Sequence, residues 1–166
     1  MIPPKTQHEI RNGFAIIQSG MKHIEKAIRP DSSEIISPLG HWRLRMDTEG
    51  SGKFGAKRAG SYHLAIDIED KPGAELVSPC DAKILRYFNV YENNPKYTGM
   101  ELLANSGRLI IQLRYVLPFE GLAPDLSQGQ LIGSLDDIRE RYSHKMKAHL
   151  DFRIMINPLI FGGNNV

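Results

Sequence analysis

The chain has 166 residues, of which 41% are hydrophobic and 24% charged, and its 21 basic and 19 acidic side chains leave a formal net charge of +2. This composition fits one folded domain with a single core and excludes a disordered chain. Neither sign of charge forms a run long enough for a nucleic-acid-binding arm, and the single cysteine, Cys80, excludes a disulfide framework and a cysteine-rich zinc module.

The first predicted element is an amphipathic helix over residues 6–28. Apolar residues recur there at spacings of three and four, the period of a helix with one apolar face: Ile10, Phe14, Ile17, Met21, Ile24 and Ile28. We expect residues 1–36 to form an N-terminal helical segment that packs on the main domain or on a partner. The first residues lack a basic segment followed by an apolar run, so we expect no signal peptide, and no window has the apolar length of a membrane span.

After Pro38 the pattern changes to short apolar or alternating runs separated by Gly, Pro, Asn and Asp: "YHLAIDI", "AELVSP", "AKILRYF", "RLIIQLRYVL", "GQLIGSL" and "AHLDFRIMI". Such runs are typical of strands joined by turns. We therefore predict a mainly β, antiparallel domain over residues 37–166. Residues 91–107 are predicted as an elaborated hairpin loop between two strands.

Two of these runs carry pairs of polar side chains that could bind a metal. His63 and Asp67 are four residues apart in "HLAID", and His149 and Asp151 are two apart in "HLDF". In an extended strand each pair lies on one face, at separations of about 13 Å and about 7 Å. His63 and Asp67 can therefore share an ion only if the strand bends or ends between them. Spacing alone is weak evidence, because polar residues are common on a half-exposed strand face.

The order of the segments resembles the LytM and lysostaphin-type zinc endopeptidases over residues 37–161. The matching residues are Phe54, Gly55, Arg58, His63, Ile66, Asp67, Ile68, Pro72, Gly73, Val77, Pro79, Gly129, Gln130, Ile132, Gly133, His149, Leu150, Phe152, Ile154, Asn157 and Pro158. The resemblance implies a compact antiparallel β domain of the duplicated hybrid motif fold, with an open groove for a peptidoglycan peptide.

The same resemblance implies a Zn²⁺ cofactor and the roles of individual residues. His63 and Asp67 correspond to zinc ligands, and His149 corresponds to a catalytic residue. Asp151 stands at the third ligand position, where the family has a histidine. Arg58 and Tyr62 are candidate substrate-binding residues.

Two departures from the family pattern bear on activity. A carboxylate can bind zinc, so Asp151 is compatible with a metal site, but two carboxylates and one imidazole should acidify a bound water less than more neutral ligands do. The family also has a catalytic histidine in a Tyr-x-His segment, and Leu117 in "RYVLP" stands at that position. His41 and His144 either compensate for this loss or are surface histidines.

We predict a zinc-dependent peptidoglycan endopeptidase. The alternatives are a catalytically degenerate domain of the same fold that binds the wall or regulates a partner, and a structural module of a phage tail or baseplate. A wall-directed protein without a signal peptide is typical of bacteriophage. We therefore expect synthesis in the cytoplasm and delivery to the wall by a virion or lysis system, with phage structural proteins as candidate partners of the N-terminal helix.

Overall fold

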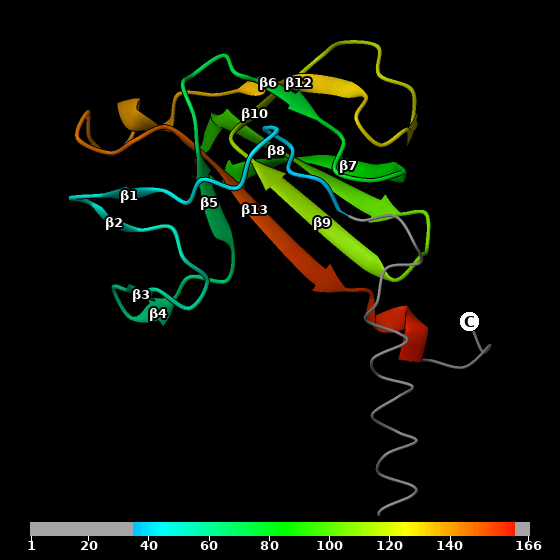
Figure 1. The fold of residues 1–166 in the computed structure, drawn as a ribbon, viewed down its shortest axis with the longest axis horizontal. Helices are drawn as coiled ribbons and strands as arrows, with labels where there is room; N and C mark the ends of the chain where they lie inside the picture. Colours follow the sequence, from blue (N-terminus) through cyan, green and yellow to red (C-terminus); the bar gives the residue numbers. More distant parts are fainter. Residues whose placement is uncertain (1–34, 162–166) are drawn as a thin grey trace, which may run out of the picture.

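The computed structural model describes residues 35–161, which form two antiparallel sheets and two small hairpins (Figure 1). The larger sheet has six strands in the order β11-β7-β8-β9-β13-β5, and the smaller has three in the order β10-β12-β6. The larger sheet consists of β5 (Ile66–Glu69), β7 (Ala82–Tyr91), β8 (Asn94–Ala104), β9 (Leu109–Arg114), β11 (Asp125–Leu126) and β13 (His149–Ile156). The smaller consists of β6 (Glu75–Val77), β10 (Val116–Pro118) and β12 (Leu131–Leu135).

Two hairpins precede the larger sheet in the chain. One pairs β1 (Met46–Asp47) with β2 (Gly50–Ser51), and the other pairs β3 (Lys57–Arg58) with β4 (Ser61–Tyr62). Figure 1 shows both at the side of the larger sheet that ends in β5. Two short 3₁₀ helices, η1 (Ile138–Glu140) and η2 (Pro158–Phe161), complete the secondary structure of the described residues. The prediction of a mainly β, antiparallel domain is confirmed.

The helix predicted over residues 6–28 lies outside the described residues and stays a prediction. Between residues 35 and 161, no helix has the length and apolar character needed to cross a membrane.

The hydrophobic core lies between the two sheets because each strand presents alternate residues to it. In β9 the burial alternates strictly: Leu109, Ile111 and Leu113 face the core, and the residues between them face the open side of the sheet. The smaller sheet contributes Leu76, Val116, Ile132 and Leu135, and the larger contributes Ile68, Met100, Leu102, Leu150 and Phe152 among others. The open face of the larger sheet is therefore free to carry polar groups.

Cys80 is part of this core. It is buried, and burial, assisted by the charge of Asp81, raises the pKa of its thiol to about 11. A thiol with this pKa is protonated at neutral pH and is a poor nucleophile. Cys80 is therefore a small packing residue of the core.

The prediction of a long hairpin loop over residues 91–107 is wrong. Strand β8 occupies Asn94–Ala104 and pairs with β7 from Ala82↔Ala104 to Tyr91↔Asn94, so the turn between the two strands is short. Its sequence contains Asn, Pro and Gly, which have low β propensity, and long-range pairing on both sides overrides that propensity. At Gly99 the ring of Phe88 occupies the place of a side chain, since a Cβ there would lie 2.4 Å from Cζ of Phe88.

Candidate metal centre

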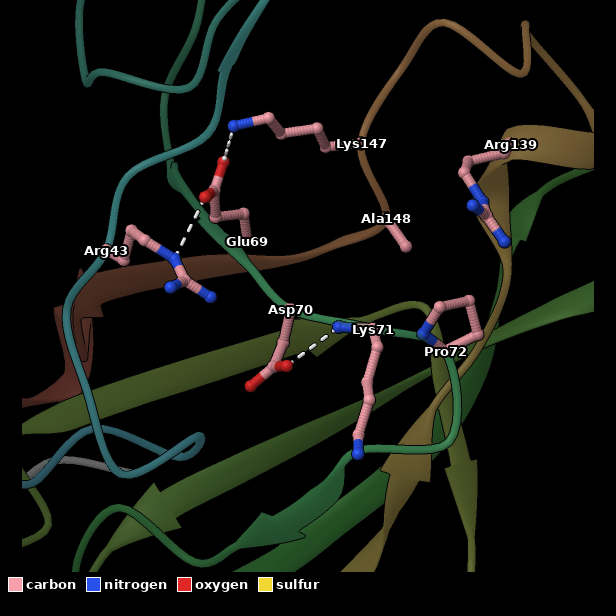
Figure 2. Close-up of a pocket in the computed structure, with 8 residues that line it drawn as sticks. All are labelled: Arg43, Glu69, Asp70, Lys71, Pro72, Arg139, Lys147 and Ala148. Atoms are coloured by element: carbon pink, nitrogen blue, oxygen red, sulfur yellow. Dashed lines mark hydrogen bonds and ion pairs between the residues drawn. The ribbon is translucent and has the colours of Figure 1, made fainter.

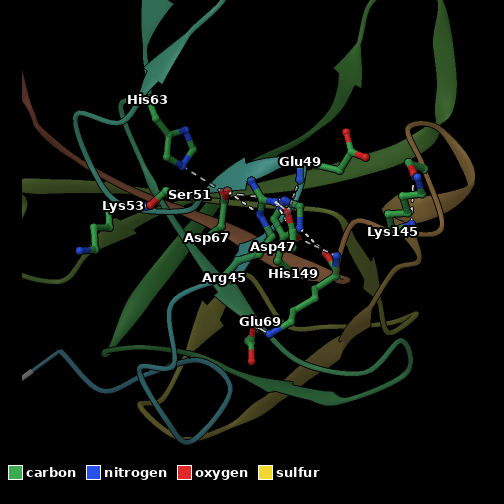
Figure 3. A network of polar contacts seen from close by, with 12 residues as sticks. Arg45, Asp47, Glu49, Ser51, Lys53, His63, Asp67, Glu69, Lys145 and His149 are labelled. Atoms are coloured by element: carbon green, nitrogen blue, oxygen red, sulfur yellow. Dashed lines mark hydrogen bonds and ion pairs between the residues drawn. The ribbon is translucent and has the colours of Figure 1, made fainter.

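His63 and Asp67 come together because the strand that carries Asp67 begins after His63. Strand β5 starts at Ile66, and His63 lies in the connection from β4. The two residues are therefore not on one flat strand, and Nε2 of His63 lies 3.0 Å from Oδ1 of Asp67. Figure 3 shows the ring of His63 directed toward this carboxylate. The bend that a shared ion requires is present.

Asp151 joins this pair from the neighbouring strand. It is the direct partner of Asp67 in the antiparallel pairing of β13 with β5. One ligand atom from each of His63, Asp67 and Asp151 lies within 4.8 Å of the other two. Their side chains are only 10%, 3% and 10% exposed. The structure thus brings together the three residues predicted as metal ligands.

Two atoms of this group have no hydrogen-bond partner among residues 35–161. They are Nε2 of His63 and Oδ1 of Asp151, both buried, and the contact between His63 and Asp67 is close but does not have hydrogen-bond geometry. A buried polar atom without a partner costs about 1–3 kcal/mol. Zinc binds imidazole nitrogen and carboxylate oxygen at about 2.0–2.2 Å, so the ligand atoms of a tetrahedral site lie roughly 3.3 Å apart. The donor set and its spacing fit zinc after small rotations of the side chains.

Asp67 is held in place through its second oxygen. Nε of Arg45 donates to Oδ2 at 3.1 Å, and Nη2 of Arg58 lies 3.5 Å from the same atom. Arg45 is itself buried and also holds both oxygens of Asp47, at 2.7 and 2.8 Å. Partners of this kind orient a metal ligand and leave its other oxygen free for the ion.

The surroundings of Asp67 also fix its ionisation. Burial acts to raise the pKa of Asp67, but His63, His149 and Arg45 outweigh burial, and the pKa lies below the ordinary value. Asp67 is therefore a carboxylate at neutral pH. An ionised carboxylate is the form that binds a metal.

Asp151 has the opposite shift. Burial raises the pKa of Asp151, and the negative charge of Asp67 raises it further, against the opposing effect of Arg114. Nε of Arg114 lies 4.0 Å from Oδ1 of Asp151. Without a cation between them, the two carboxylates favour protonation of Asp151, and a dication would remove that tendency.

His149 begins β13 and lies beside the same carboxylate. Its Nδ1 lies 2.8 Å from the backbone oxygen of Lys147, which can only accept, so Nδ1 carries the proton. Its Nε2 lies 3.8 Å from Oδ1 of Asp67. Burial lowers the pKa of His149 by more than Asp67 and the Lys147 carbonyl raise it. At neutral pH the ring is therefore uncharged, with a free lone pair on Nε2.

These groups line one cavity of about 290 Å³. The lining residues are Arg45, Glu49, Arg58, His63, Asp67, Tyr115, Tyr142, Met146, His149 and Asp151. Arg58, predicted to bind substrate, therefore lines the cavity, where its guanidinium contacts Asp67. Tyr62, the other predicted substrate-binding residue, is 68% exposed on β4 and does not line the cavity.

A second hollow of about 250 Å³ lies near the first, beyond the start of β13 (Figure 2). Figure 2 shows Arg43 and Lys147 reaching Glu69 from two sides, at 2.9 and 2.7 Å. The two cations thus share one carboxylate, Glu69. Within the described residues, the group of potential metal ligands is the one formed by His63, Asp67 and Asp151.

The histidines considered as substitutes lie elsewhere. His41 contacts Asp70 at 3.0 Å, and His144 is exposed, so neither lines the cavity and both agree with the surface interpretation. Leu117 is on β10 of the smaller sheet, 46% exposed and also outside the cavity lining.

Arg45 and two tyrosines in the cavity were not predicted from the sequence. Arg45 lies 22 residues from Asp67 in the chain and has no motif around it. Tyr115 is the second residue of the segment "RYVLP", where the matching of residues pointed to Leu117. Its positive φ of 68° breaks the strand alternation and could not be read from the residue pattern.

Solved structures with a similar fold include those of lysostaphin and LytU. An NMR structure of lysostaphin has a TM-score of 0.53 and 19% identity, covering 76% of this chain and 49% of that chain, so the present chain spans about half of it. The structure of LytU has a TM-score of 0.51 and 20% identity, covering 69% of this chain and 75% of that chain. No model of a known family and no curated protein sequence matches. At these identities the similarity shows the fold.

Proposed function

We propose, on the premise that the chain has the LytM and lysostaphin-type fold, that it is a zinc-dependent endopeptidase that cleaves peptide bonds of peptidoglycan. The observation that carries the proposal is that Nε2 of His63 and Oδ1 of Asp151 are buried without a hydrogen-bond partner among residues 35–161, in a group whose ligand atoms lie within 4.8 Å of one another and whose third member is Asp67. A metal ion bound there would satisfy all three atoms.

His63, Asp67 and Asp151 would hold the zinc, which when bound supplies a Lewis acid and a water of lowered pKa. The chain's own residues supply the proton transfer. His149 has a free lone pair on Nε2 at the cavity and can take a proton from water. Its Nδ1 proton is bonded to the carbonyl of Lys147, and this bond fixes the tautomer and stabilises the imidazolium that forms.

Arg45 lines the cavity and acts through the candidate metal ligand Asp67. By holding Oδ2 of Asp67 and both oxygens of Asp47, it prevents the carboxylate of Asp67 from rotating. Asp67 therefore presents Oδ1 to His63 and His149 without losing conformational entropy when a ligand binds.

A second candidate is a catalytically degenerate domain that binds the wall, regulates a partner or serves in a phage tail. The observation that favours it is the number of guanidinium groups around the two carboxylates. Arg45 and Arg58 contact Asp67, and Arg114 lies near Asp151. These cations partly neutralise the acidic pair without a metal. Delivery by a virion or lysis system stays a prediction for either candidate.

Zinc titration of the wild type, Asp151→Ala and Asp151→His, combined with release of soluble fragments from purified peptidoglycan, separates the two candidates. The endopeptidase predicts that wild type binds zinc, that Asp151→Ala loses metal and activity together, and that Asp151→His keeps or strengthens binding because imidazole is also a zinc ligand. Absence of zinc binding by wild type at micromolar metal would reject the enzyme and leave the degenerate domain.

A further inference from the structure

Three tyrosine hydroxyls form a hydrogen-bonded chain beside the cavity. The hydroxyl of Tyr91 lies 2.9 Å from that of Tyr115 and 2.9 Å from that of Tyr142. Tyr91 ends β7, Tyr115 lies between β9 and β10, and Tyr142 lies in the connection between η1 and β13. The two outer members, Tyr115 and Tyr142, line the cavity that holds the candidate metal ligands.

Tyr115 is the member closest to the reacting groups. Its ring packs edge-on against His149, with centroids 5.5 Å apart and planes at 83°. It is 7% exposed, and the charge of Asp151 acts on its hydroxyl. Tyr142, in contrast, is 55% exposed at the mouth of the cavity.

An unusual backbone conformation places Tyr115 there. Its φ of 68° is the one positive value among the non-glycine residues from 35 to 161. Such a conformation costs about 1–3 kcal/mol and persists only where its surroundings enforce it. Here the N–H of Tyr115 donates to the oxygen of Thr98, and its own oxygen accepts from the N–H of Asp136, both at 2.9 Å. Tyr115 thus has this strained conformation where the chain passes from β9 of the larger sheet to β10 of the smaller one.

The chain of hydroxyls leaves one proton unused. Three hydroxyls have three O–H donors, and two hydrogen bonds between them consume two. Either oxygen of each pair can be the donor, so the chain can run in two directions. When Tyr142 donates to Tyr91 and Tyr91 donates to Tyr115, the remaining donor is the O–H of Tyr115, and in the reverse direction it is the O–H of Tyr142. An acceptor that becomes negatively charged beside Tyr115 favours the first direction, and successive hydrogen bonds in that direction polarise each other and strengthen the last donor.

Tyr115 is protonated at neutral pH. Burial raises the pKa of Tyr115 far above its ordinary value, and Tyr91 and the charge of Asp151 raise it further. The group is therefore a neutral donor and never an anion that would repel negative charge.

We propose that the hydroxyl of Tyr115 donates a hydrogen bond to the carbonyl oxygen of the cleaved peptide bond as that oxygen becomes negatively charged. This inference rests on the proposed endopeptidase function and adds a catalytic residue to it. It also gives the site a hydrogen-bond donor for the oxyanion. The position of the family's second catalytic histidine holds Leu117, which lies outside the cavity lining.

In the cleavage step the oxygen of water bonds to the carbonyl carbon, and the carbonyl π electrons move onto the oxygen that Tyr115 contacts. The proton of the water passes to Nε2 of His149 and then to the amide nitrogen, which leaves as an amine when the C–N bond breaks. The carbonyl then re-forms, and Tyr115 keeps its proton throughout.

The test compares Tyr115→Phe with Tyr142→Phe and a matched control, Tyr97→Phe. Tyr97 belongs to the same aromatic cluster and packs edge-on against Tyr115, but it does not line the cavity. For peptidoglycan cleavage we expect Tyr115→Phe to lower kcat about 10²-fold with an unchanged KM, the effect of removing one oxyanion donor. Tyr142→Phe should have a smaller effect, and Tyr97→Phe none.

Binding measurements give a readout that does not depend on turnover. A phosphinic peptide has a tetrahedral anionic group in place of the cleaved amide, and an unmodified wall peptide does not. Tyr115→Phe should weaken binding of the phosphinic peptide by a factor similar to its loss of kcat, with binding of zinc and of the unmodified peptide unchanged.

The other outcomes distinguish failure of the role of Tyr115 from failure of the endopeptidase function. If wild type cleaves peptidoglycan and Tyr115→Phe cleaves it equally fast, the role of Tyr115 is refuted and the endopeptidase function stands. If Tyr97→Phe loses as much kcat as Tyr115→Phe, packing of the cluster explains the effect, and the proposal also fails. If wild type binds no zinc and cleaves nothing, the endopeptidase function itself is rejected, and the role of Tyr115 with it.

Discussion

Asp151 and Asp67 are direct partners across the antiparallel pair of β13 and β5. Two like charges at opposed positions destabilise a sheet, and both side chains are nearly buried. An arginine lies beside each carboxylate: Nε of Arg45 is 3.1 Å from Oδ2 of Asp67, and Nε of Arg114 is 4.0 Å from Oδ1 of Asp151. A metal ion held by both carboxylates would neutralise their remaining negative charge.

Zinc is therefore expected to stabilise the protein. At a free zinc concentration 100 times Kd, the free energy of unfolding should rise by about 2.7 kcal/mol, and Tm by about 5–10 °C. Asp151→Asn removes a ligand together with the opposed charge, so it should lose the zinc-dependent rise without losing stability in a chelator. Differential scanning calorimetry with zinc and with chelator checks this. Glu49→Gln, which alters a cavity residue outside the ligand group, should keep the full rise.

Replacing Arg45 with Met should destabilise the fold strongly. Arg45 is buried and bonded to both Asp47 and Asp67, so its loss leaves two nearly buried carboxylates without their main cation. The expected decrease in the free energy of unfolding is about 3–5 kcal/mol, measured by urea denaturation. Arg86→Met is the matched control. Arg86 also contacts a carboxylate through two nitrogens, but its side chain is 61% exposed, and its loss should cost much less than the loss of Arg45. Equal costs for the two variants would contradict the role of Arg45.

Gly52 is expected to control the position of Asp67. A Cβ at Gly52 would lie 2.6 Å from Cβ of Asp67 and 2.9 Å from its backbone oxygen. Gly52→Ala should therefore displace Asp67 and weaken zinc binding about 10- to 100-fold, as loss of a supporting group does at other metal sites. Isothermal titration calorimetry measures the change. Gly99→Ala is equally crowded, against Phe88 and away from the cavity, so it should lower stability and leave zinc affinity unaltered.

Glu101 should contribute a pH-dependent part of the stability. The hydrogen bonds from Arg86, opposed by burial and assisted by Gln112, hold the pKa of Glu101 below its ordinary value of about 4.3. A carboxyl with a lowered pKa in the folded state stabilises the fold fully above its unfolded pKa, and this stabilisation is lost as pH falls through the folded pKa. Glu101→Gln should thus be less stable than wild type at pH 7, and the difference should shrink below about pH 4. Urea denaturation across this range is the measurement, and a constant difference would refute it.

The sequence by itself determined the fold class and predicted four residues that the structure brings to one cavity, His63, Asp67, His149 and Asp151. Alternating runs such as "RLIIQLRYVL" predict strands because period-two burial is a local property of an extended chain, and β9 shows that alternation residue by residue. The same period of two predicts that His149 and Asp151 share one face of a strand. It also predicts that His63 and Asp67 meet only at a bend. That local geometry holds in the structure, where β5 begins between them.

The tertiary structure alone decided how these residues meet and what surrounds them. Pairing of β13 with β5 sets Asp151 opposite Asp67, and register between distant strands depends on packing of both sheets, which no local pattern contains. Long-range pairing likewise turned a segment rich in Asn, Pro and Gly into β8. The positive φ of Tyr115 is enforced by Thr98 and Asp136, and Arg45 reaches Asp67 across 22 residues. Such contacts exist only once the chain has folded, because they join groups that local propensity leaves apart.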